Sequence, residues 1–337
     1  MNKIPYLIYL VLFLLACNNE DSIIVEQEEE ETMDILNIIK PKGLYASSVG
    51  SGNALNNSEA RGSLVRVKWS ELEPQQGVFD FSKIDSQVEI IKAAGKEWSL
   101  GLIGGSSSPS WLIEESGADS FEILFRGDPV IIPKIWDAVV NEKLAILAET
   151  LANKYNNDTT LILVYIPQMT SNGIEGHFNG VQSDVLLNAG FTSDLWVESV
   201  KETARIFANA FTNKAVAVEL HEILQDVSIP ERIMNDLWND PSLEQRVGAA
   251  MWWLSGKTSF QNNLVNALTA FPGDIYAQVI GRSDQSDRFE NDDYTTVFLQ
   301  AKTIGIRYVE PWEYEFVNDT FPNEMKDFND YVDTLYK

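Results

Sequence analysis

The sequence predicts an α/β protein built as a single (β/α)8 barrel. From about residue 40 onward, short apolar runs alternate with longer amphipathic segments, which indicates parallel strand–helix–strand units. Eight such runs fit into about 300 residues, the usual size of this barrel. No Pro- and Gly-rich linker or change of composition divides the region. We therefore expect residues 40–337 to form one domain.

The expected elements follow one another in chain order. The apolar runs that we assign to strands are 43–49, 64–69, 98–103, 161–166, 215–221, a poorly defined one at 258–260, 275–280 and 306–310. Helical periodicity predicts helices at 84–94, 136–155, 195–210, 237–254 and 294–304. A doubly wound open sheet is the main alternative. It lacks support, because the first run continues as GLYASSVGSGN, without the spacing of a dinucleotide-binding loop.

The charge balance excludes one class of partner. The chain of 337 residues has 25 Lys and Arg against 50 Asp and Glu, a formal net charge of -25. This field repels a phosphate backbone, so we expect no nucleic-acid binding.

The N-terminus predicts export and lipidation. Residues 1–16 combine a cationic start, a short apolar stretch and Leu-Leu-Ala before Cys17, which is typical of a signal peptide and too short for a comfortable membrane span. The ending resembles the lipobox of bacterial lipoproteins, and Cys17 is the only cysteine. Residues 17–39 are acidic and predict a disordered tether. We expect an outer-membrane lipoprotein of the Bacteroidota type that faces the periplasm or the cell surface.

The run LVRVKW at 64–69 places two cations on alternate positions of a strand. In a barrel, one face of each strand points inward, and the mouth at the strand C-termini carries the chemistry. Arg66 and Lys68 share a parity, so both can point inward toward carboxylates at the mouth. An unpaired buried charge is costly, and a partner is therefore expected.

One long segment resembles a known group of enzymes. The stretch VRVKWSELEPQQGVFDFSKIDSQVEIIKAAGKEWSLGL is similar to strands two and three of clan A glycoside hydrolases, which include families 42 and 5. The segment SSSPSWL resembles the Pro-x-Trp-Leu that follows strand three in family 42. The resemblance covers about residues 60 to 180. It implies a (β/α)8 glycoside hydrolase with two carboxyl groups at the mouth, of the retaining type.

The chain departs from clan A at both catalytic positions. Strand four should end in Asn-Glu, but this chain has Gln168 and Met169 there, and Glu175 follows several residues later. Strand seven should carry the nucleophilic Glu, but it offers Gln278. The catalytic pair therefore has to be sought among other residues.

Glycoside hydrolysis needs one protonated and one ionised carboxyl group. Glu175, beside His177, is our candidate acid/base, and Glu310 at the end of strand eight is our first candidate for the second carboxylate. Glu219 and Glu222 are the alternatives. In the strand that bears them, Val216, Val218 and Leu220 take the helix-facing parity, so Glu219 and His221 should point inward.

Three aromatic residues are candidate platforms for sugar rings, whose C–H faces stack on aromatics. Trp312 follows strand eight, where clan A enzymes place a Trp, and Trp69 and Trp111 lie at or just past strand ends. We expect no metal and no cofactor, because the chain has two His and lacks His-x-x-x-His.

These features predict a monomeric, lipid-anchored glycoside hydrolase that cleaves a polysaccharide or oligosaccharide, with Arg66 keeping the second carboxylate ionised. The alternative is a non-catalytic glycan-binding lipoprotein on a degenerate barrel, because strand seven holds no acid.

Overall fold

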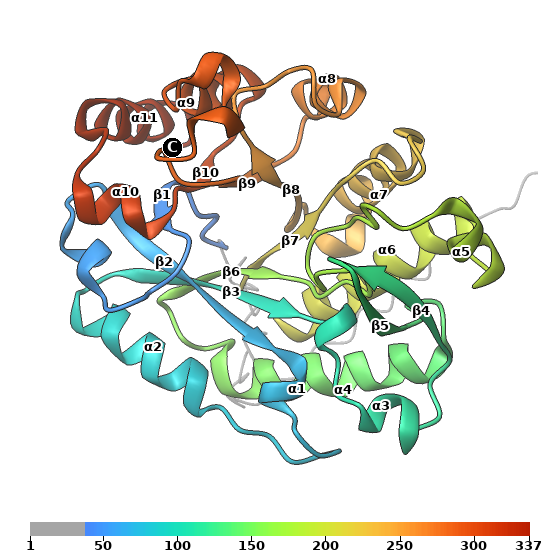
Figure 1. Cartoon of the computed structure of the whole chain (residues 1–337). Helices are drawn as coiled ribbons and strands as arrows, with labels where there is room; N and C mark the ends of the chain where they lie inside the picture. Colours follow the sequence, from blue (N-terminus) through green and yellow to red (C-terminus); the bar gives the residue numbers. More distant parts are fainter. Residues whose placement is uncertain (1–37) are drawn as a thin grey trace, which may run out of the picture. The chain divides into compact units, whose positions relative to one another are not determined.

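A closed barrel of eight parallel strands forms the centre of the protein (Figure 1). The computed structural model describes residues 38–337; the predicted signal peptide, Cys17 and nearly all of the tether lie outside this range. The strand order is β1-β10-β9-β8-β7-β6-β3-β2, with helices around the outside (Figure 1). The predicted (β/α)8 fold is therefore confirmed. In the described range, no helix has the length and apolar character needed to cross a membrane.

The barrel strands are β1 Gly43–Ala46, β2 Ala60–Lys68, β3 Glu97–Ile103, β6 Leu161–Tyr165, β7 Ala215–Glu219, β8 Val247–Leu254, β9 Ile275–Val279 and β10 Tyr308–Glu310. The longer helices are α2 Ser82–Ala93, α4 Ala138–Tyr155, α6 Ser193–Ala210, α7 Ser228–Asn239, α8 Asn262–Ala270, α9 Thr296–Ile304 and α11 Pro322–Leu335. Four short helices complete the set: α1 Trp69–Leu72, α3 Trp111–Glu114, α5 Ser183–Asn188 and α10 Glu313–Asn318.

The ends of the long helices follow local chemistry. Asp137 begins α4 by accepting the backbone N–H of Val139 and Val140, and Thr192 begins α6 by accepting that of Leu195. Both satisfy amides that the first helical turn leaves free. Gly305 ends α9 in the left-handed conformation, with φ of 83°, which glycine adopts without strain.

Strand alternation separates two cores. Outward residues such as Val216 and Val218 pack against the helices. Inward residues form a second cluster in the barrel, made of Tyr45, Leu64, Leu163, Tyr165, Ala215, Ala217, Ala250, Trp252, Tyr276 and Tyr308, with Ile162 and Ile174. The parity predicted for β7 is therefore correct.

The strand expected at 258–260 was wrong, because the sixth barrel strand is β8, Val247–Leu254. The helix expected at 237–254 was also wrong: the helix in this region is α7, which ends at Asn239. Every residue of β8 is buried, so the sequence VGAAMWWL shows no strand alternation and is equally compatible with a helix. Trp252 points into the barrel, 5.1 Å from the ring of Tyr165.

The antiparallel hairpin that follows β3 was not predicted from the sequence. Strands β4 Ser120–Phe125 and β5 Asp128–Pro133 pair outside the barrel. Phe121 of this hairpin lies 6.2 Å from the ring of Phe178 and 6.3 Å from that of Trp136. The hairpin therefore packs against the long loop that follows β6.

The Trp-Glu-Pro motif after β2 is structural. The buried Glu73 carboxylate accepts a hydrogen bond from Trp69 Nε1 at 2.9 Å and one from the Gly77 N–H at 2.8 Å. Its backbone carbonyl accepts Trp111 Nε1 at 2.9 Å. Trp69 and Trp111 are 0% and 3% exposed and meet edge to face. As placed, neither ring can stack on a sugar, which corrects the expectation for both.

Glu73→Ala should lower the free energy of unfolding by about 1 to 3 kcal/mol, because the buried Trp69 indole N–H and the more exposed Gly77 N–H lose their acceptor. Glu73→Gln should cost about half as much, since one amide oxygen can still accept one donor. Glu71→Ala, an exposed control in α1 that removes an ion pair with Lys83, should cost less than about 1 kcal/mol. Urea unfolding measures all three, and equal losses for Glu73→Ala and Glu71→Ala would contradict the assignment.

Candidate active site

The loop that joins β6 to α5 carries Glu175 to the C-terminal mouth of the barrel. Its turn depends on Gly173, whose φ is 82°; a Cβ there would lie 2.1 Å from the carbonyl oxygen of Gly104. The Gly173 carbonyl accepts the N–H of Gly104 at 2.8 Å and that of Gln168 at 3.0 Å. The loop is therefore anchored to the end of β3 on one side and to its own base on the other.

Donors surround the Glu175 carboxylate. Asn172 Nδ2 donates to Oε1 at 2.6 Å, His177 Nε2 lies 3.3 Å from Oε2 and His221 Nε2 lies 3.7 Å from it. Burial alone raises the pKa of Glu175, but hydrogen bonds and charge from the two histidines outweigh it and lower the pKa to about 2. The side chain is 26% exposed. It is thus an ionised carboxylate that solvent and ligands can reach.

Glu219 is buried beneath this carboxylate. Its Oε2 accepts the N–H of Gly176 at 2.7 Å, and its Oε1 accepts that of Trp252 at 3.0 Å. Its Oε1 also lies 3.2 Å from His221 Nε2. Burial raises the pKa of Glu219. Because its side chain is 0% exposed, Glu219 positions the loop and the histidine and does not face the mouth.

His221 joins the two carboxylates. Burial works to lower its pKa, but Glu219 and Glu175 more than offset this and raise the pKa to about 9. Gln261 Nε2 lies 2.9 Å from its Nδ1, and Gln261 Oε1 accepts the N–H of Glu222 at 2.7 Å. The inward orientation of Glu219 and His221 is as predicted from strand parity.

The ligand atoms of Glu175, His177 and His221 lie within 4.8 Å of one another, a spacing that a metal ion could bridge. The hydrogen bonds favour another arrangement. The Asn179 N–H donates to His177 Nδ1 at 3.1 Å, so the proton of a neutral imidazole sits on Nε2, facing Glu175. A metal ligand needs that nitrogen free of its proton. The cluster thus contains an ionised carboxylate that accepts a hydrogen bond from Asn172 and lies close to two imidazoles.

Glu310 lies within the barrel, below the mouth. Its Oε1 accepts hydrogen bonds from Tyr308 at 2.6 Å and Tyr165 at 3.1 Å, and its Oε2 accepts one from Gln278 Nε2 at 2.7 Å. The residue is 0% exposed. Burial raises the pKa of Glu310 to about 7, although these hydrogen bonds and the charge of Arg66 act to lower it.

The pKa shifts of Glu175 and Glu310 are the reverse of those that their expected roles require. An acid/base has to hold a proton and a nucleophile has to be ionised, whereas Glu175 has the low pKa and Glu310 the high one. Arg66 acts on Glu310 with the expected sign, but the pair forms no ion pair within 4.0 Å among the residues that the structure covers. Gln278 belongs to the Glu310 network and is buried.

The remaining predicted residues lie at the rim. Glu222 is half-buried, and its Oε1 is a buried oxygen without a hydrogen-bond partner in the described part of the chain. Trp312 is half-buried and donates through Nε1 to the Val279 carbonyl at 2.8 Å. It lines a cavity of about 610 Å³ together with Arg282, Arg288 and Tyr314. Its ring therefore remains a candidate platform.

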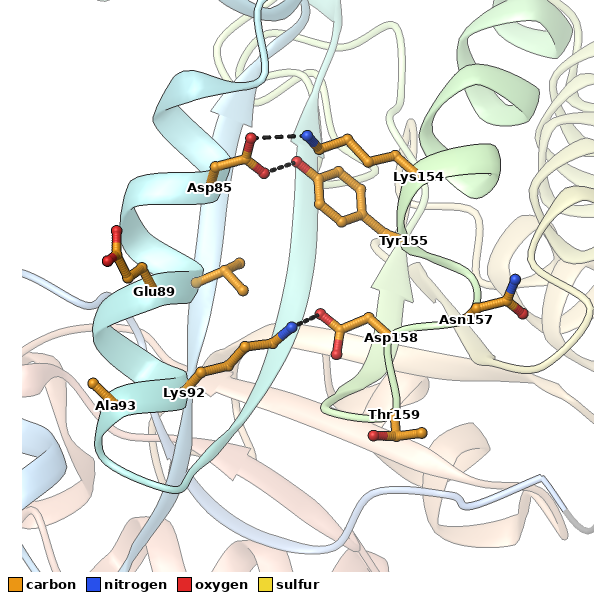
Figure 2. A pocket seen from close by; sticks show the side chains of 10 residues that line it. Asp85, Glu89, Lys92, Ala93, Lys154, Tyr155, Asn157, Asp158 and Thr159 are labelled. Carbon is orange, nitrogen blue, oxygen red and sulfur yellow. Dashed lines mark hydrogen bonds and ion pairs between the residues drawn. The ribbon is translucent and has the colours of Figure 1, made fainter.

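A second hollow lies away from the mouth, on the outer face between α2 and α4 (Figure 2). Asp85 accepts Lys154 Nζ and the Tyr155 hydroxyl, both at 2.8 Å, and Lys92 pairs with Asp158 at 2.7 Å. These charged groups satisfy one another. The hollow is thus a seam of ion pairs between two helices.

With this geometry described, the chain can be compared with known proteins. Residues 59–172 match the glycoside hydrolase family 42 model, described as beta-galactosidase. The family 42 match covers about a third of the chain, from β2 to the loop that carries Glu175. It confirms the resemblance found in the sequence for this segment. A search of curated protein sequences gives no match.

A solved structure shares the fold of this chain. The catalytic domain of beta-amylase from Paenibacillus polymyxa superimposes with a TM-score of 0.60 at 9% identity, over 89% of this chain and 100% of that one. Endo-glycoceramidase II from Rhodococcus sp., solved as its lactosyl-enzyme intermediate, gives a TM-score of 0.49 at 12% identity, over 82% and 73% of the two chains. At such identities, the beta-amylase likeness establishes the shared barrel alone.

Sequence reasoning missed the part played by Gln168. This residue stands near the position where clan A relatives carry Asn-Glu, and its Nε2 donates to the carbonyls of Ile174 at 3.1 Å and Glu219 at 2.7 Å. It is 1% exposed, so it fixes the loop instead of contacting substrate. No sequence pattern marked Asn172, three residues before Glu175, as the donor to its carboxylate.

Glu310 should make stability depend on pH. Its pKa rises from 4.5 in the unfolded chain to about 7 in the fold, so the folded state binds the proton more tightly. That stabilisation is complete below about pH 4.5 and is lost as the pH rises through about 7; it amounts to about 3 kcal/mol. In Glu310→Gln, which stays neutral, the free energy of unfolding should lack this fall.

Urea unfolding at intervals between pH 4.5 and 8 measures the difference between wild type and Glu310→Gln. Glu142→Gln, an exposed carboxylate on α4, is the control and should follow wild type. Parallel curves for wild type and Glu310→Gln would show that Glu310 is already ionised at pH 5.

Proposed function

We propose that the protein is a glycoside hydrolase that cleaves a polysaccharide or oligosaccharide at the barrel mouth. The observation that carries this proposal is the family 42 segment at 59–172, because it leads directly into the loop that presents Glu175. Glu175 is ionised and partly exposed, as a nucleophile or a general base must be. The mouth of a (β/α)8 barrel is also where catalytic residues collect.

Glu222 is the second carboxyl group in this proposal. It stands next to His221 and is half-buried; its Oε1 is a buried oxygen that accepts no hydrogen bond from the described residues. Glu310 and Glu219 are enclosed, at 0% and 2% exposed, and belong to the supporting structure. The retaining outcome suggested by the clan A resemblance requires carboxyl groups about 5 to 5.5 Å apart, and inversion requires about 6.5 to 9.5 Å.

Glu175→Gln should reduce hydrolysis at least about 100-fold, because a neutral amide can neither attack nor accept a proton. Reducing-end release from a panel of β-galactosides and other oligosaccharides, supplied to the full chain, measures the effect on the substrate that wild type cleaves. Glu149→Gln, on the outside of α4, is the matched control and should leave the rate unchanged. Undiminished hydrolysis by Glu175→Gln would remove Glu175 from the mechanism.

Glycan binding without hydrolysis is the second candidate function. The observation that favours it is Gln278, which occupies the position of the clan A nucleophile and donates to the buried Glu310. This alternative predicts that wild type is retained by a glycan in affinity electrophoresis while releasing no reducing ends from it.

The location of the protein rests on the N-terminal sequence. We infer that the chain is a monomer attached to the outer membrane through a lipid on Cys17, with the acidic tether between the lipid and the barrel. Incorporation of labelled palmitate into wild type and its loss in Cys17→Ala would support the anchor. Equal labelling of the two chains would refute it.

A further inference from the structure

The side chains of Arg66 and Lys68, two of the three cations of β2, form no ion pair or hydrogen bond with the described residues, whereas Arg61 pairs with Asp333. Among the Lys and Arg side chains of residues 38–337, three make no hydrogen bond, ion pair or cation–π contact with any described residue. They are Arg66, Lys68 and the C-terminal Lys337. Neither cation forms the expected ion pair within 4.0 Å, although the charge of Arg66 acts to lower the pKa of Glu310 and that of Lys68 acts to lower the pKa of Glu71.

Both cations lie at the candidate active site. Arg66 is half-buried and points inward, and Lys68, the last residue of β2, is exposed at the rim. Arg66 faces Gly101 of β3, where an added Cβ would lie 3.3 Å from Arg66 Cγ and 3.2 Å from Ile174 Cδ1. Ile174 immediately precedes Glu175. The arginine and the loop that carries the proposed catalytic carboxylate thus border the same glycine.

An unpaired guanidinium is unexpected in this chain. Acidic residues outnumber basic ones two to one, so carboxylates were available as partners, and most of the other described cations have one or donate to a carbonyl. Partial burial also weakens the hydration of the Arg66 charge, a cost that a partner would offset. The field of Glu310 reaches Arg66, but the two groups form no ion pair.

We propose that Arg66, assisted by Lys68, binds the carboxylate of an acidic sugar, so that the substrate is a uronic acid-containing glycan. This inference rests on the proposed function and specifies its substrate class. A guanidinium presents a planar fork of N–H donors that matches a carboxylate in bidentate fashion. Lys68 at the rim adds a second positive charge where the ligand enters. The net charge of -25 acts against anions at long range but is screened beyond about 8 Å at physiological ionic strength.

Calorimetric binding to the full chain tests this proposal, with Glu175→Gln as the background so that turnover does not interfere. The probes are oligogalacturonate, oligomannuronate and oligoglucuronate, the carboxyl-reduced neutral counterpart of each, and a sulfated galactan oligosaccharide. At least one carboxylated probe should bind about 10-fold or more tightly than its neutral counterpart. Arg66→Gln should abolish that preference, and Arg66→Lys should keep part of it because charge remains while the fork is lost.

Lys68→Gln should reduce the preference by about 2- to 3-fold, as expected for an exposed charge. Arg232→Gln, which removes a half-buried arginine on α7 that pairs with Asp194, is the control and should not change it. The proposal would be overturned if carboxylated and neutral probes bound with equal affinity, or if Arg66→Gln weakened the binding of both equally. Stronger binding of the sulfated probe, or no binding of any probe, would also overturn it. Hydrolysis of neutral glycans with no uronate preference would overturn this inference and leave the proposed function standing.

Discussion

The hydrogen bonds to Glu310 unite the interior of the barrel. Ser99 of β3, Tyr165 of β6, Gln278 of β9 and Tyr308 of β10 all direct polar groups at this one carboxyl. Tyrosines fill the inside of the barrel well, but each buried hydroxyl needs a partner. Glu310 supplies an acceptor for two of them and joins strands that are far apart in the sequence.

This arrangement explains the departure from clan A at β9. A Glu at position 278 would put a second carboxyl against Glu310 in a space closed to solvent, where two like charges cannot both be ionised. Gln278 donates a hydrogen bond there instead. The carboxyl that accepts hydrogen bonds from these tyrosines lies on β10, and it is buried too deeply to meet a ligand.

A second buried carboxyl supports the mouth. Glu219 links β7 to β8 through the Trp252 N–H and to the Glu175 loop through the Gly176 N–H. Glu175 and its donors are thus the partly exposed groups of the site, and the buried Glu219 holds their loop in place. Glu310 links the strands of the closed barrel, and Glu219 positions the site. Loss of Glu310 should therefore affect mainly stability, and loss of Glu219 mainly the geometry of the site.

Sequence patterns correctly predicted the inward or outward orientation of residues in strands that show clear alternation. The alternation in β7 placed Glu219 and His221 inward, and the parity of β2 placed Arg66 inward. Local patterns failed at β8, where burial on both faces removes alternation, and at Trp69, whose indole is buried and donates to Glu73 instead of facing the mouth. The environment of Glu175 could not be foreseen, because its donors come from its own loop and from β7, which meet only in the closed barrel.

The most direct test of this account is a crystal structure of Glu175→Gln with a bound oligosaccharide that wild type cleaves. The account predicts a glycosidic linkage at the mouth, within hydrogen-bonding distance of the side chain at position 175 and on the side of Arg66. An oligosaccharide bound only elsewhere, such as in the hollow between α2 and α4, would contradict it.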